Sequence, residues 1–429
     1  MLPVLVPIAA LLLSDALLLV GHGLLLTMLP IAAANAGFSD TQVALTGSAY
    51  FLGFVSGCLI APFAVRRVGH IRSFAVLATS YSALVLIFPM LPAFVGWLLL
   101  RFLVGAAISG LYMIIESWLN ERATGENRGT LLSVYTVINL LMITVGQQMM
   151  NLVLPDPFYI FALAAVLLSL AIIPVSLTLA LAPAPLQNVK ISLRRVWHLS
   201  HIGLVGAVAS GLVTGAFWSL GPLFAKTQGL DTFQLTIFMS ATVFGGAVFQ
   251  LPLGRLSDHV DRRVVVAAAA LGGALVSVLM VVLPTMLPEQ GAWLLCVLAF
   301  FWGGTVMTQY AICLAHANDS AEPDEFVMVG SAMLLTLGFC SAIGAPMASL
   351  TMRYLGASGL FAFSASCLLI TFLIIMVRRH MHELPVEIDV EPFRAAADTT
   401  TPTVFEMDPR TQEDEDSIET DSALDRSDQ

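Results

Sequence analysis

Charged side chains are scarce in this chain of 429 residues, of which Asp, Glu, Lys and Arg together make up 11%. A soluble protein of this length needs a larger charged surface. Hydrophobic residues make up 58% of the chain. They gather in continuous runs of about 20, the length of helix that crosses a hydrocarbon core of roughly 30 Å. Because the runs do not alternate between apolar and polar positions, they predict membrane-spanning helices and not the strands of a barrel.

Sequence patterns for several kinds of chemistry are missing as well. The five cysteines lie inside apolar runs, with no C-x-x-C pair and no histidine at the spacing of a zinc site. No G-x-x-x-x-G-K-[ST] motif is present, which argues against ATP as the energy source. We find no metal cluster, no nucleophile elbow and no nucleic-acid-binding pattern. We therefore expect no enzymatic activity, no cofactor, no metal and no nucleic-acid partner.

Twelve hydrophobic runs predict an all-α polytopic membrane protein that lies in the lipid bilayer. The runs cover residues 5–32, 41–65, 73–91, 94–118, 129–153, 158–181, 199–225, 232–253, 264–286, 291–316, 326–351 and 359–377. The predicted units are a six-helix bundle over residues 1–181, a linker over 182–198, a second six-helix bundle over 199–379 and a tail over 380–429. We expect the protein to be a monomer.

Basic residues occur in alternate loops between the runs. One set of loops holds thirteen of them: Arg66, Arg67, Arg72, Arg122, Arg128, Lys190, Arg194, Arg195, Arg255, Arg262, Arg263, Arg378 and Arg379. The other set holds only Lys226 and Arg353. Since cytoplasmic loops carry an excess of Lys and Arg, the pattern predicts that both termini and the linker are cytoplasmic.

The acidic residues are concentrated in the C-terminal tail. Residues 383–429 hold 15 of the 29 acids and three arginines, so they contribute −12 to a net charge of −10. Low hydrophobicity with high charge predicts that residues 380–429 are disordered. The tail has the charge to bind a basic partner, although a solvated appendage is the simpler interpretation.

The chain also repeats itself. A shift of 192 residues superimposes the first two runs on the seventh and eighth, and a shift of 198 superimposes the fourth and fifth on the tenth and eleventh. The matched glycines and prolines include Gly23 with Gly215, Pro30 with Pro222, Gly53 with Gly245, Gly105 with Gly303, and Gly146 with Gly344. Because glycine and proline set helix approach and helix bends, these matches indicate shared architecture. The repeat predicts two parallel halves around a cavity near the middle of the bilayer.

The loop after the eighth run contains a charged motif, Gly254-Arg-Leu-Ser-Asp258-His-Val-Asp-Arg262-Arg263. Asp258 is placed to face the positive end of a neighbouring helix, and Arg262 to pair with a carboxylate across the seam between the halves. Such a cluster would hold the cytoplasmic side shut, whereas a hairpin with ordinary positive-inside charge is the plainer alternative. The loop resembles the G-x-L-x-D-x-x-x-R-[RK] motif of the major facilitator superfamily.

Two further stretches carry this resemblance. Arg101-x-x-x-Gly105 looks like a second motif of the superfamily, and Glu116-Ser-Trp-Leu-Asn, followed by Asn127-Arg128-Gly129, resembles its YcaD-like bacterial branch. The first-half counterpart of the charged loop departs from the pattern, with Pro62 in place of the glycine and Arg66 in place of the aspartate. The resemblance covers about residues 10–380 and implies a secondary transporter of the bacterial inner membrane without indicating its substrate.

Charged groups inside the runs are candidates for proton coupling, since charge in the bilayer core is costly and normally faces a cavity or a partner. Asp15 and His22 lie on one face of the first predicted helix. Asp15 is the leading candidate to bind and release a proton, and His22 can titrate near neutral pH. The resemblance to the superfamily implies that Arg101 tunes the proton site. The alternatives are a carboxylate or histidine satisfied within the bundle and an arginine that reaches the outer interface.

Other polar residues are candidates for a gate or for contact with the solute. We expect Glu116, near the cytoplasmic end of the fourth run, to form a gate salt bridge with Arg66, Arg67 or Arg128. In the resembled fold, helices one, four, seven and ten line the cavity. Candidate solute contacts in or beside these helices are Tyr112, Asn139, Thr214, Trp218 and Gln309. Packing between helices is the alternative for each of them.

The combined features predict a secondary active transporter that moves a small solute by alternating access and uses protons as the coupling ion. An uncoupled facilitator is one alternative. A membrane receptor or scaffold that uses the same fold without transport is the other, and the acidic tail is the only feature that favours it.

Overall fold

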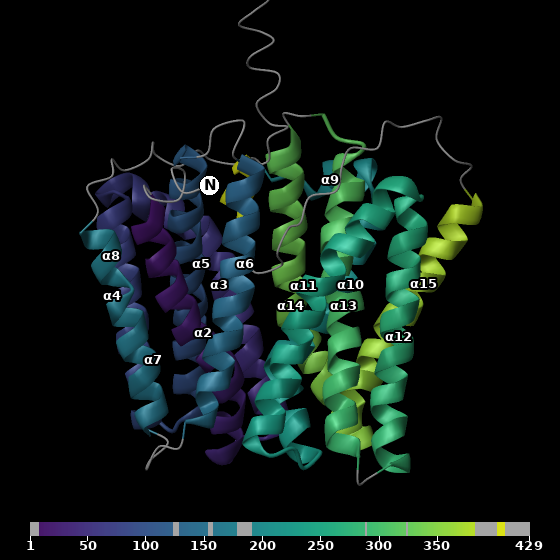
Figure 1. Ribbon diagram of the computed structural model, residues 1–429, viewed down its shortest axis with the longest axis horizontal. Coiled ribbons are helices and arrows are strands. Elements are labelled where there is room, and N and C mark those ends of the chain that lie inside the picture. The colour runs from purple at the N-terminus through teal and green to yellow at the C-terminus, as the bar shows by residue number, and fades with distance from the viewer. Residues whose placement is uncertain are drawn as a thin grey trace, which may run out of the picture.

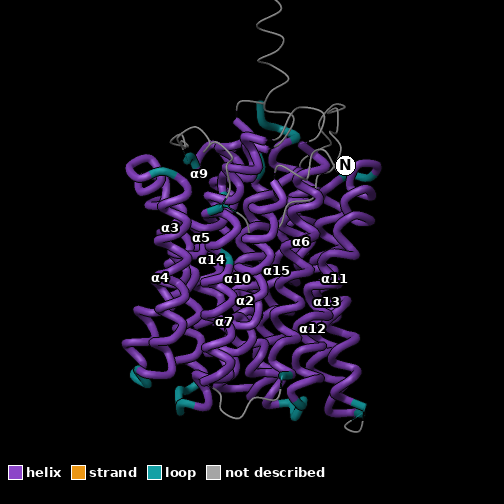
Figure 2. The backbone as a smooth tube through the Cα atoms, turned by 60° about the vertical axis from the view of Figure 1, so that its left-hand side comes forward, coloured by secondary structure: helices purple, strands orange, loops and turns teal. Residues whose placement is uncertain are grey.

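The computed structural model describes residues 8–122, 128–152, 158–177, 191–287, 290–322, 325–381 and 401–407. Within these residues the regular elements are helices and no strand occurs (Figure 2). In the described part of the chain, eleven helical segments are long and apolar enough to cross a membrane. The last, Phe326–His380, contains two helices, because the chain turns at Gly356, whose φ of 64° favours glycine. The described helices thus make twelve spans, which confirms the predicted all-α polytopic fold.

The helices gather in two groups that lie side by side, purple to blue and teal to yellow in Figure 1. The first group comprises α2 (Ala9–Asn35), α3 (Asp40–Val68), α4 (His70–Met90), α5 (Phe94–Arg122), α6 (Arg128–Gln148), α7 (Phe158–Leu170) and α8 (Ile172–Ser176). The second comprises α10 (His201–Thr227), α11 (Thr232–His259), α12 (Arg262–Met286), α13 (Gly291–Asn318), α14 (Phe326–Leu355) and α15 (Gly359–Met381). The short helix α9 (Leu193–Leu199) precedes the second group.

The second long helix of each group begins in the same way. At the start of α3, the Gln42 N–H donates to the Ser39 hydroxyl at 3.3 Å, and the Ser39 N–H donates to the Gln42 side chain at 2.9 Å. At the start of α11, Asp231 and Gln234 form the same reciprocal pair, at 2.8 and 3.2 Å. Each pair satisfies two backbone donors of a helix start. The shift of 192 residues therefore extends to local hydrogen bonding.

Glycines that repeat between the groups bring helix backbones into direct contact. A Cβ atom at Gly23 of α2 would overlap the backbone of Ile143 in α6. The equivalent crossing joins α10 to α14, where a Cβ at Gly215 would overlap the backbone of Ser341. Ile143 and Ser341 are themselves 198 residues apart, so both partners of the crossing repeat. Side chains larger than hydrogen are excluded at these two positions.

A second pair of crossings follows the same rule. A Cβ at Gly53 of α3 would overlap the Phe102 carbonyl of α5, and a Cβ at Gly245 of α11 would overlap the Phe300 carbonyl of α13. The two groups therefore share backbone contacts as well as helix order.

The two ends of the bundle differ in charge. Helices α3, α5, α11 and α15 run toward the end drawn at the top of Figure 1 and bring Arg66, Arg122, Arg255 and Arg378 there. We call this end the basic face. The other end, where α2 and α10 finish, is the opposite face.

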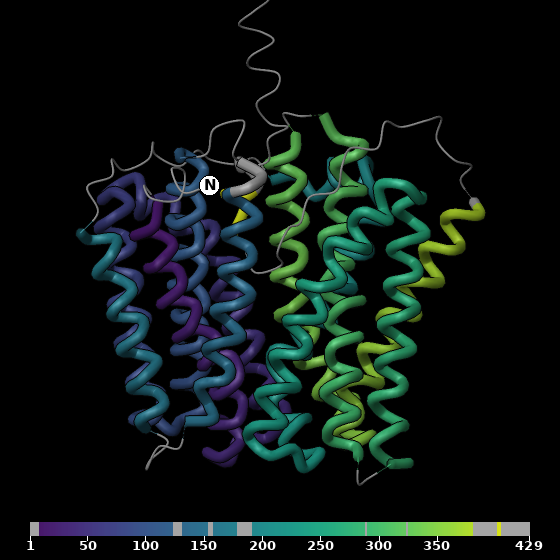
Figure 3. Tube along the Cα trace, viewed as in Figure 1, coloured from purple at the N-terminus to yellow at the C-terminus, as the bar shows by residue number. Residues whose placement is uncertain are grey.

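Helical structure occurs in both the predicted linker and the predicted tail. Helix α9 falls in the predicted linker, and its Arg195 donates to Glu325 at 2.8 and 3.0 Å, at the start of α14. The 3-10 helix η5 (Pro402–Met407) falls in the predicted disordered tail and is the short yellow segment beside α6 in Figure 3. Thr401 next to it is completely buried, so disorder is the wrong description of residues 401–407. The rest of the tail lies outside the described residues.

We expect Gly53→Ala to lower the unfolding temperature in detergent, because the added methyl group displaces the Phe102 carbonyl and so separates α3 from α5. Overpacking of this kind costs about 1–3 kcal/mol. Gly272→Ala in α12 is the matched control, since its methyl group would meet only the Thr305 methyl at 3.3 Å. Equal unfolding temperatures for the two variants in a thermal melt would contradict the account of the crossing.

Candidate functional site

A cavity lies between the two groups of helices. Its wall consists of His22 and Leu26 from α2, Tyr50, Phe51 and Phe54 from α3, Tyr112 from α5, Ile143 from α6, Thr214 and Trp218 from α10, and Leu334, Leu337, Gly338 and Ser341 from α14. Sites for small organic ligands are mostly apolar, with a few placed polar groups. The cavity therefore has the lining of a small-molecule site.

A hydrogen-bonded cluster forms the polar part of the first-group wall. The Nδ1 atom of His22 is 2.7 Å from the Tyr81 hydroxyl, and its Nε2 atom is 3.2 Å from the Tyr50 hydroxyl. The Arg101 guanidinium lies over the Tyr50 ring, 5.0 Å from its centroid. A neutral imidazole has one donor and one acceptor nitrogen, so one tyrosine accepts from His22 and the other donates to it. The cluster joins four helices, α2 to α5, behind one side of the cavity.

The second-group wall presents an aromatic ring and hydroxyl groups. Trp218 and Thr214 are one turn apart on α10 and both line the cavity. The Thr214 hydroxyl donates to the Ser210 carbonyl at 2.7 Å. Behind Trp218, the Phe217 ring packs against Trp302, with centroids 4.8 Å apart. This layer of aromatic side chains supports the wall from the protein side.

Four of the residues proposed from the sequence line the cavity: His22, Tyr112, Thr214 and Trp218. Four others are buried elsewhere in the bundle: Asp15, Arg101, Asn139 and Gln309. Sequence reasoning missed the contribution of α3 and α14, which supply seven lining residues. The aromatic spacing of Tyr50, Phe51 and Phe54 was the available signal for α3, since these rings lie within one helical turn.

Polar side chains join the two groups on the opposite-face side of the cavity. Gln148, at the end of α6, donates to Ser240 of α11 at 2.7 Å, and Asn151 donates to Thr236 at 2.9 Å. A third bond runs from the Ser48 hydroxyl of α3 to the Ala342 carbonyl of α14, at 2.6 Å. These bonds join the two groups near the opposite face.

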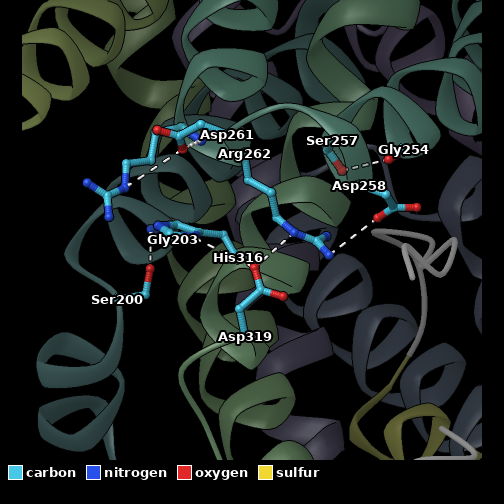
Figure 4. Close-up of polar contacts among 10 residues, drawn as sticks. Ser200, Gly203, Gly254, Ser257, Asp258, Asp261, Arg262, His316 and Asp319 are labelled. Carbon is cyan, nitrogen blue, oxygen red and sulfur yellow. Dashed lines mark hydrogen bonds and ion pairs between the residues drawn. The ribbon is translucent and has the colours of Figure 1, made fainter. Parts of the chain in front are cut away.

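On the basic face, Arg262 lies between two carboxylates (Figure 4). Its guanidinium is 2.9 Å from Asp319, at the end of α13, and 3.4 Å from Asp258, at the end of α11. Both of these carboxylates belong to the second group, and the predicted pairing of Arg262 across the seam stays a prediction. Gly254, on the same turn as Asp258, accepts a hydrogen bond from Ser257 at 2.6 Å (Figure 4). The motif thus ties together three helix ends of one group.

Glu116 has partners other than the predicted arginines. Its carboxylate is completely buried and accepts hydrogen bonds from Tyr135 at 3.2 Å, from the Thr401 N–H at 3.1 Å and from the Thr403 hydroxyl at 3.0 Å. Arg66 and Arg67 have exposed side chains, and neither is among the described groups that hydrogen-bond Glu116. Arg128 begins α6, and its side chain lies outside the described part of the chain.

Asp15 is also completely buried, on α2. Among the described residues, no donor lies within hydrogen-bonding distance of either of its carboxylate oxygens. An ionised carboxylate in such surroundings is costly. Asp15 can therefore gain or lose a proton without breaking a hydrogen bond to these residues.

The sequence matches the model of the Major Facilitator Superfamily over residues 11–286 and 203–405. The chain belongs to this superfamily. The MFS-type transporter YcaD of Escherichia fergusonii is 26% identical to it over 378 residues, 88% of this chain and 96% of YcaD. YcaD of Salmonella typhi is 26% identical over 381 residues, 88% of this chain and 97% of YcaD. The predicted resemblance to the YcaD-like branch is confirmed.

Solved structures of major facilitator transporters share the fold. The nucleoside transporter NupG superposes with a TM-score of 0.72 at 12% identity, over 86% of this chain and 98% of NupG. A D-xylose–proton symporter superposes with a TM-score of 0.63 at 14% identity, over 86% of this chain and 96% of the symporter. The family and the shared fold together make this major facilitator chain a transporter.

The His22 cluster can be tested through stability. We expect Tyr81→Phe to destabilise this major facilitator protein by about 1 kcal/mol, because it leaves one buried imidazole nitrogen without its partner. Tyr354→Phe is the matched control, since Tyr354 is 78% exposed. Chemical denaturation in detergent micelles measures both; a Tyr81→Phe curve that coincides with the Tyr354→Phe curve would show that the hydroxyl contributes nothing.

Proposed function

We propose that the chain is a proton-coupled secondary transporter that carries a neutral, ring-containing organic solute by alternating access. Its basic face is the cytoplasmic face of a bacterial-type inner membrane, because positively charged loops remain on that side. The residues on which the proposal depends are the cavity lining, the polar seam at the opposite face and the buried carboxyl group of Asp15.

The observation that carries the proposal is a cavity lined by both groups of helices, with hydrogen bonds between the groups on its opposite-face side. A cavity walled by two repeats exchanges its access when one repeat rocks against the other. The Gln148–Ser240 and Ser48–Ala342 bonds lie on the surfaces that such a motion separates. Hydroxyl and amide groups can exchange these bonds for water at modest cost.

The lining of the cavity supports the choice of solute. Apart from His22, the described side chains of the lining carry no ionisable group other than tyrosine hydroxyls. Trp218, Phe51 and Phe54 offer aromatic faces, and Thr214 and Ser341 offer hydroxyl groups. An ionised solute would leave water without gaining a counter-charge on the wall, which is costly. A neutral solute with a ring and a few polar substituents fits both surfaces.

Two groups support proton coupling. No described residue donates a hydrogen bond to the Asp15 carboxyl group. A change in the charge of Asp15 would therefore break no hydrogen bond to these residues. The His22 imidazole lies between two tyrosine hydroxyls that can each donate or accept, so it can gain a proton and keep both hydrogen bonds. Arg101 lies beyond Tyr50 and would sense the charge of this cluster. We therefore assign proton exchange to Asp15 first and to His22 second.

The uncoupled facilitator is the competing function, and it differs from the coupled transporter at Asp15. The scaffold alternative requires a partner on the tail, and a scaffold has no need of a cavity at the seam of the two groups. The transport measurements below separate these alternatives.

We expect Trp218→Ala to weaken binding of neutral ring-containing ligands by about tenfold, or 1.4 kcal/mol, through loss of stacking area. Ligands come from a thermal-shift screen of nucleosides, sugars and aromatic metabolites, since a ligand that binds the folded state raises its stability. Trp293→Ala is the matched control, because Trp293 is 53% exposed, on α13. If the Trp218→Ala variant binds these ligands as tightly as the unmodified protein, the cavity is not their binding site.

We expect Asp15→Asn to abolish accumulation of the solute against its gradient while leaving equilibration intact, because asparagine cannot exchange a proton. Proteoliposomes with an imposed pH gradient measure both quantities with a radiolabelled ligand from the screen. Asp40→Asn, which changes an exposed aspartate in the first turn of α3, serves as the control. Accumulation by Asp15→Asn at the level of the unmodified protein would contradict the coupling role.

A further inference from the structure

The segment Thr401–Met407 lies inside the basic face, far in sequence from the helices that it touches. Thr401 is 0% exposed, and Thr403 and Val404 are each 5% exposed. The segment contacts α5 and α6 of the first group and α14 of the second. It therefore bridges the two groups at the end of the bundle that lies away from the polar seam of the opposite face. We call this segment the tail plug.

Glu116 is the anchor of the tail plug. It lies six residues before the end of α5, about 9 Å along the helix axis from the basic face. Its carboxylate accepts from the Thr401 N–H at 3.2 and 3.1 Å, from the Thr403 hydroxyl at 3.0 Å, and from the Thr401 hydroxyl. The Tyr135 hydroxyl is the remaining donor, at 3.2 Å. Among the described residues, the tail thus supplies three of the four groups that hydrogen-bond this buried carboxylate.

In this contact the Glu116 carboxylate is the acceptor, and the tail plug supplies the hydrogen-bond donors. A buried carboxylate is stable when several N–H and O–H groups surround it and is costly when they leave. The oxygen atoms of the two threonine hydroxyls are 2.7 Å apart, and both hydroxyls reach the same oxygen atom of the Glu116 carboxylate. Withdrawal of the tail plug would leave Glu116 with Tyr135 alone. The plug therefore stays seated until water, or another donor, replaces it.

We propose that Thr401–Met407 is a tethered plug that seats on Glu116 and must leave before the two groups of helices can close the basic face. The proposal rests on the proposed transport function, whose alternating access requires that face to close. While seated, the plug keeps α5 and α6 apart from α14 and so favours the structure in which the opposite face is shut. The C-terminal tail thereby regulates the transport cycle of the same chain.

The seat itself can be measured without any solute. The probe is a hydrophilic maleimide, and the reporter is Val404→Cys in full-length protein whose five cysteines have been replaced by serine. The reference is His259→Cys in the same background, a change at an exposed position. In nanodiscs, where both faces are accessible, we expect the reporter thiol to react about tenfold or more slowly than the reference thiol. Equal reaction rates at the two positions would show that residue 404 is not buried, and would contradict the proposal.

The hydrogen bonds between Glu116 and the tail plug are tested by changing each side in turn. Glu116→Ala should bring the reaction rate of the reporter thiol close to that of the reference thiol, and Glu121→Ala, which changes an exposed glutamate on the same helix, should not. Because Glu116→Ala alters a buried residue, Thr401→Val with Thr403→Val provides the same test from the tail and leaves the bundle unchanged. Thr232→Val with Thr285→Val, two exposed threonines, is its control. Protection that persists in both test variants would exclude Glu116 as the anchor.

The plug function is tested by the separation of the two groups. Spin labels at Glu121 and Glu322, exposed residues beside the ends of α5 and α13 at the basic face, report that separation as a distance distribution. Deletion of residues 401–407 should add a population at shorter distance, whereas deletion of residues 417–423, of equal length, should not. An unchanged distribution after deletion of 401–407 would overturn the plug.

Solute flux then distinguishes the two proposals. Deletion of residues 401–407 should raise the initial rate of flux about two- to tenfold, because a larger fraction of molecules can complete the cycle. Flux that is unchanged or lower, in protein that transports, would contradict the plug and leave transport standing. Absence of flux in every variant, including the full chain, would contradict the transport function, while the labelling and distance measurements still decide the plug.

Discussion

Helix α2 crosses α6, and α10 crosses α14, so closely that only the hydrogen of a glycine fits between the backbones. In a bilayer the apolar surfaces of helices gain little by leaving lipid, so close packing is one of the main forces that hold them together. The contacts at Gly23 and Gly215 place the helices that carry His22 and Trp218 in equivalent positions in the two groups. The cavity lies where these equivalent positions face each other. Its location therefore follows from the duplicated crossings.

The polar groups around this cavity differ in chemistry between the opposite face, the cavity wall and the basic face. At the opposite face, neutral hydroxyl and amide groups join the two groups of helices, and such bonds exchange readily with water. In the wall, His22 is held between two tyrosines. Nearer the basic face, Glu116 is satisfied mostly by the chain's own tail, whereas Asp15 has no donor among the described residues. The carboxyl groups of Glu116 and Asp15 thus lie nearer the basic face, where the tail plug bridges the two groups of helices.

The sequence was sufficient to predict the helices and their duplication, because hydrophobic run length and glycine position act locally. It was not sufficient to predict contacts that depend on the rotation of one helix against another. Tyr50 and Ser341 face the cavity only because α3 and α14 turn those sides toward the seam, and Arg262 finds Asp319 only because α13 ends beside it. Disorder was predicted for the whole tail because its average composition is acidic and polar. That average does not reveal the short segment at Thr401, which packs in a buried position.

The account's central claim is that the opposite face opens during each transport cycle. The direct measurement is solute flux through protein in which Ser48→Cys and Ala342→Cys are joined by a disulfide across the seam, where the native hydroxyl and carbonyl are 2.6 Å apart. In proteoliposomes made from a variant otherwise free of cysteine, flux should stop on oxidation and return on reduction. Flux that continues unchanged while the disulfide is intact would contradict the account.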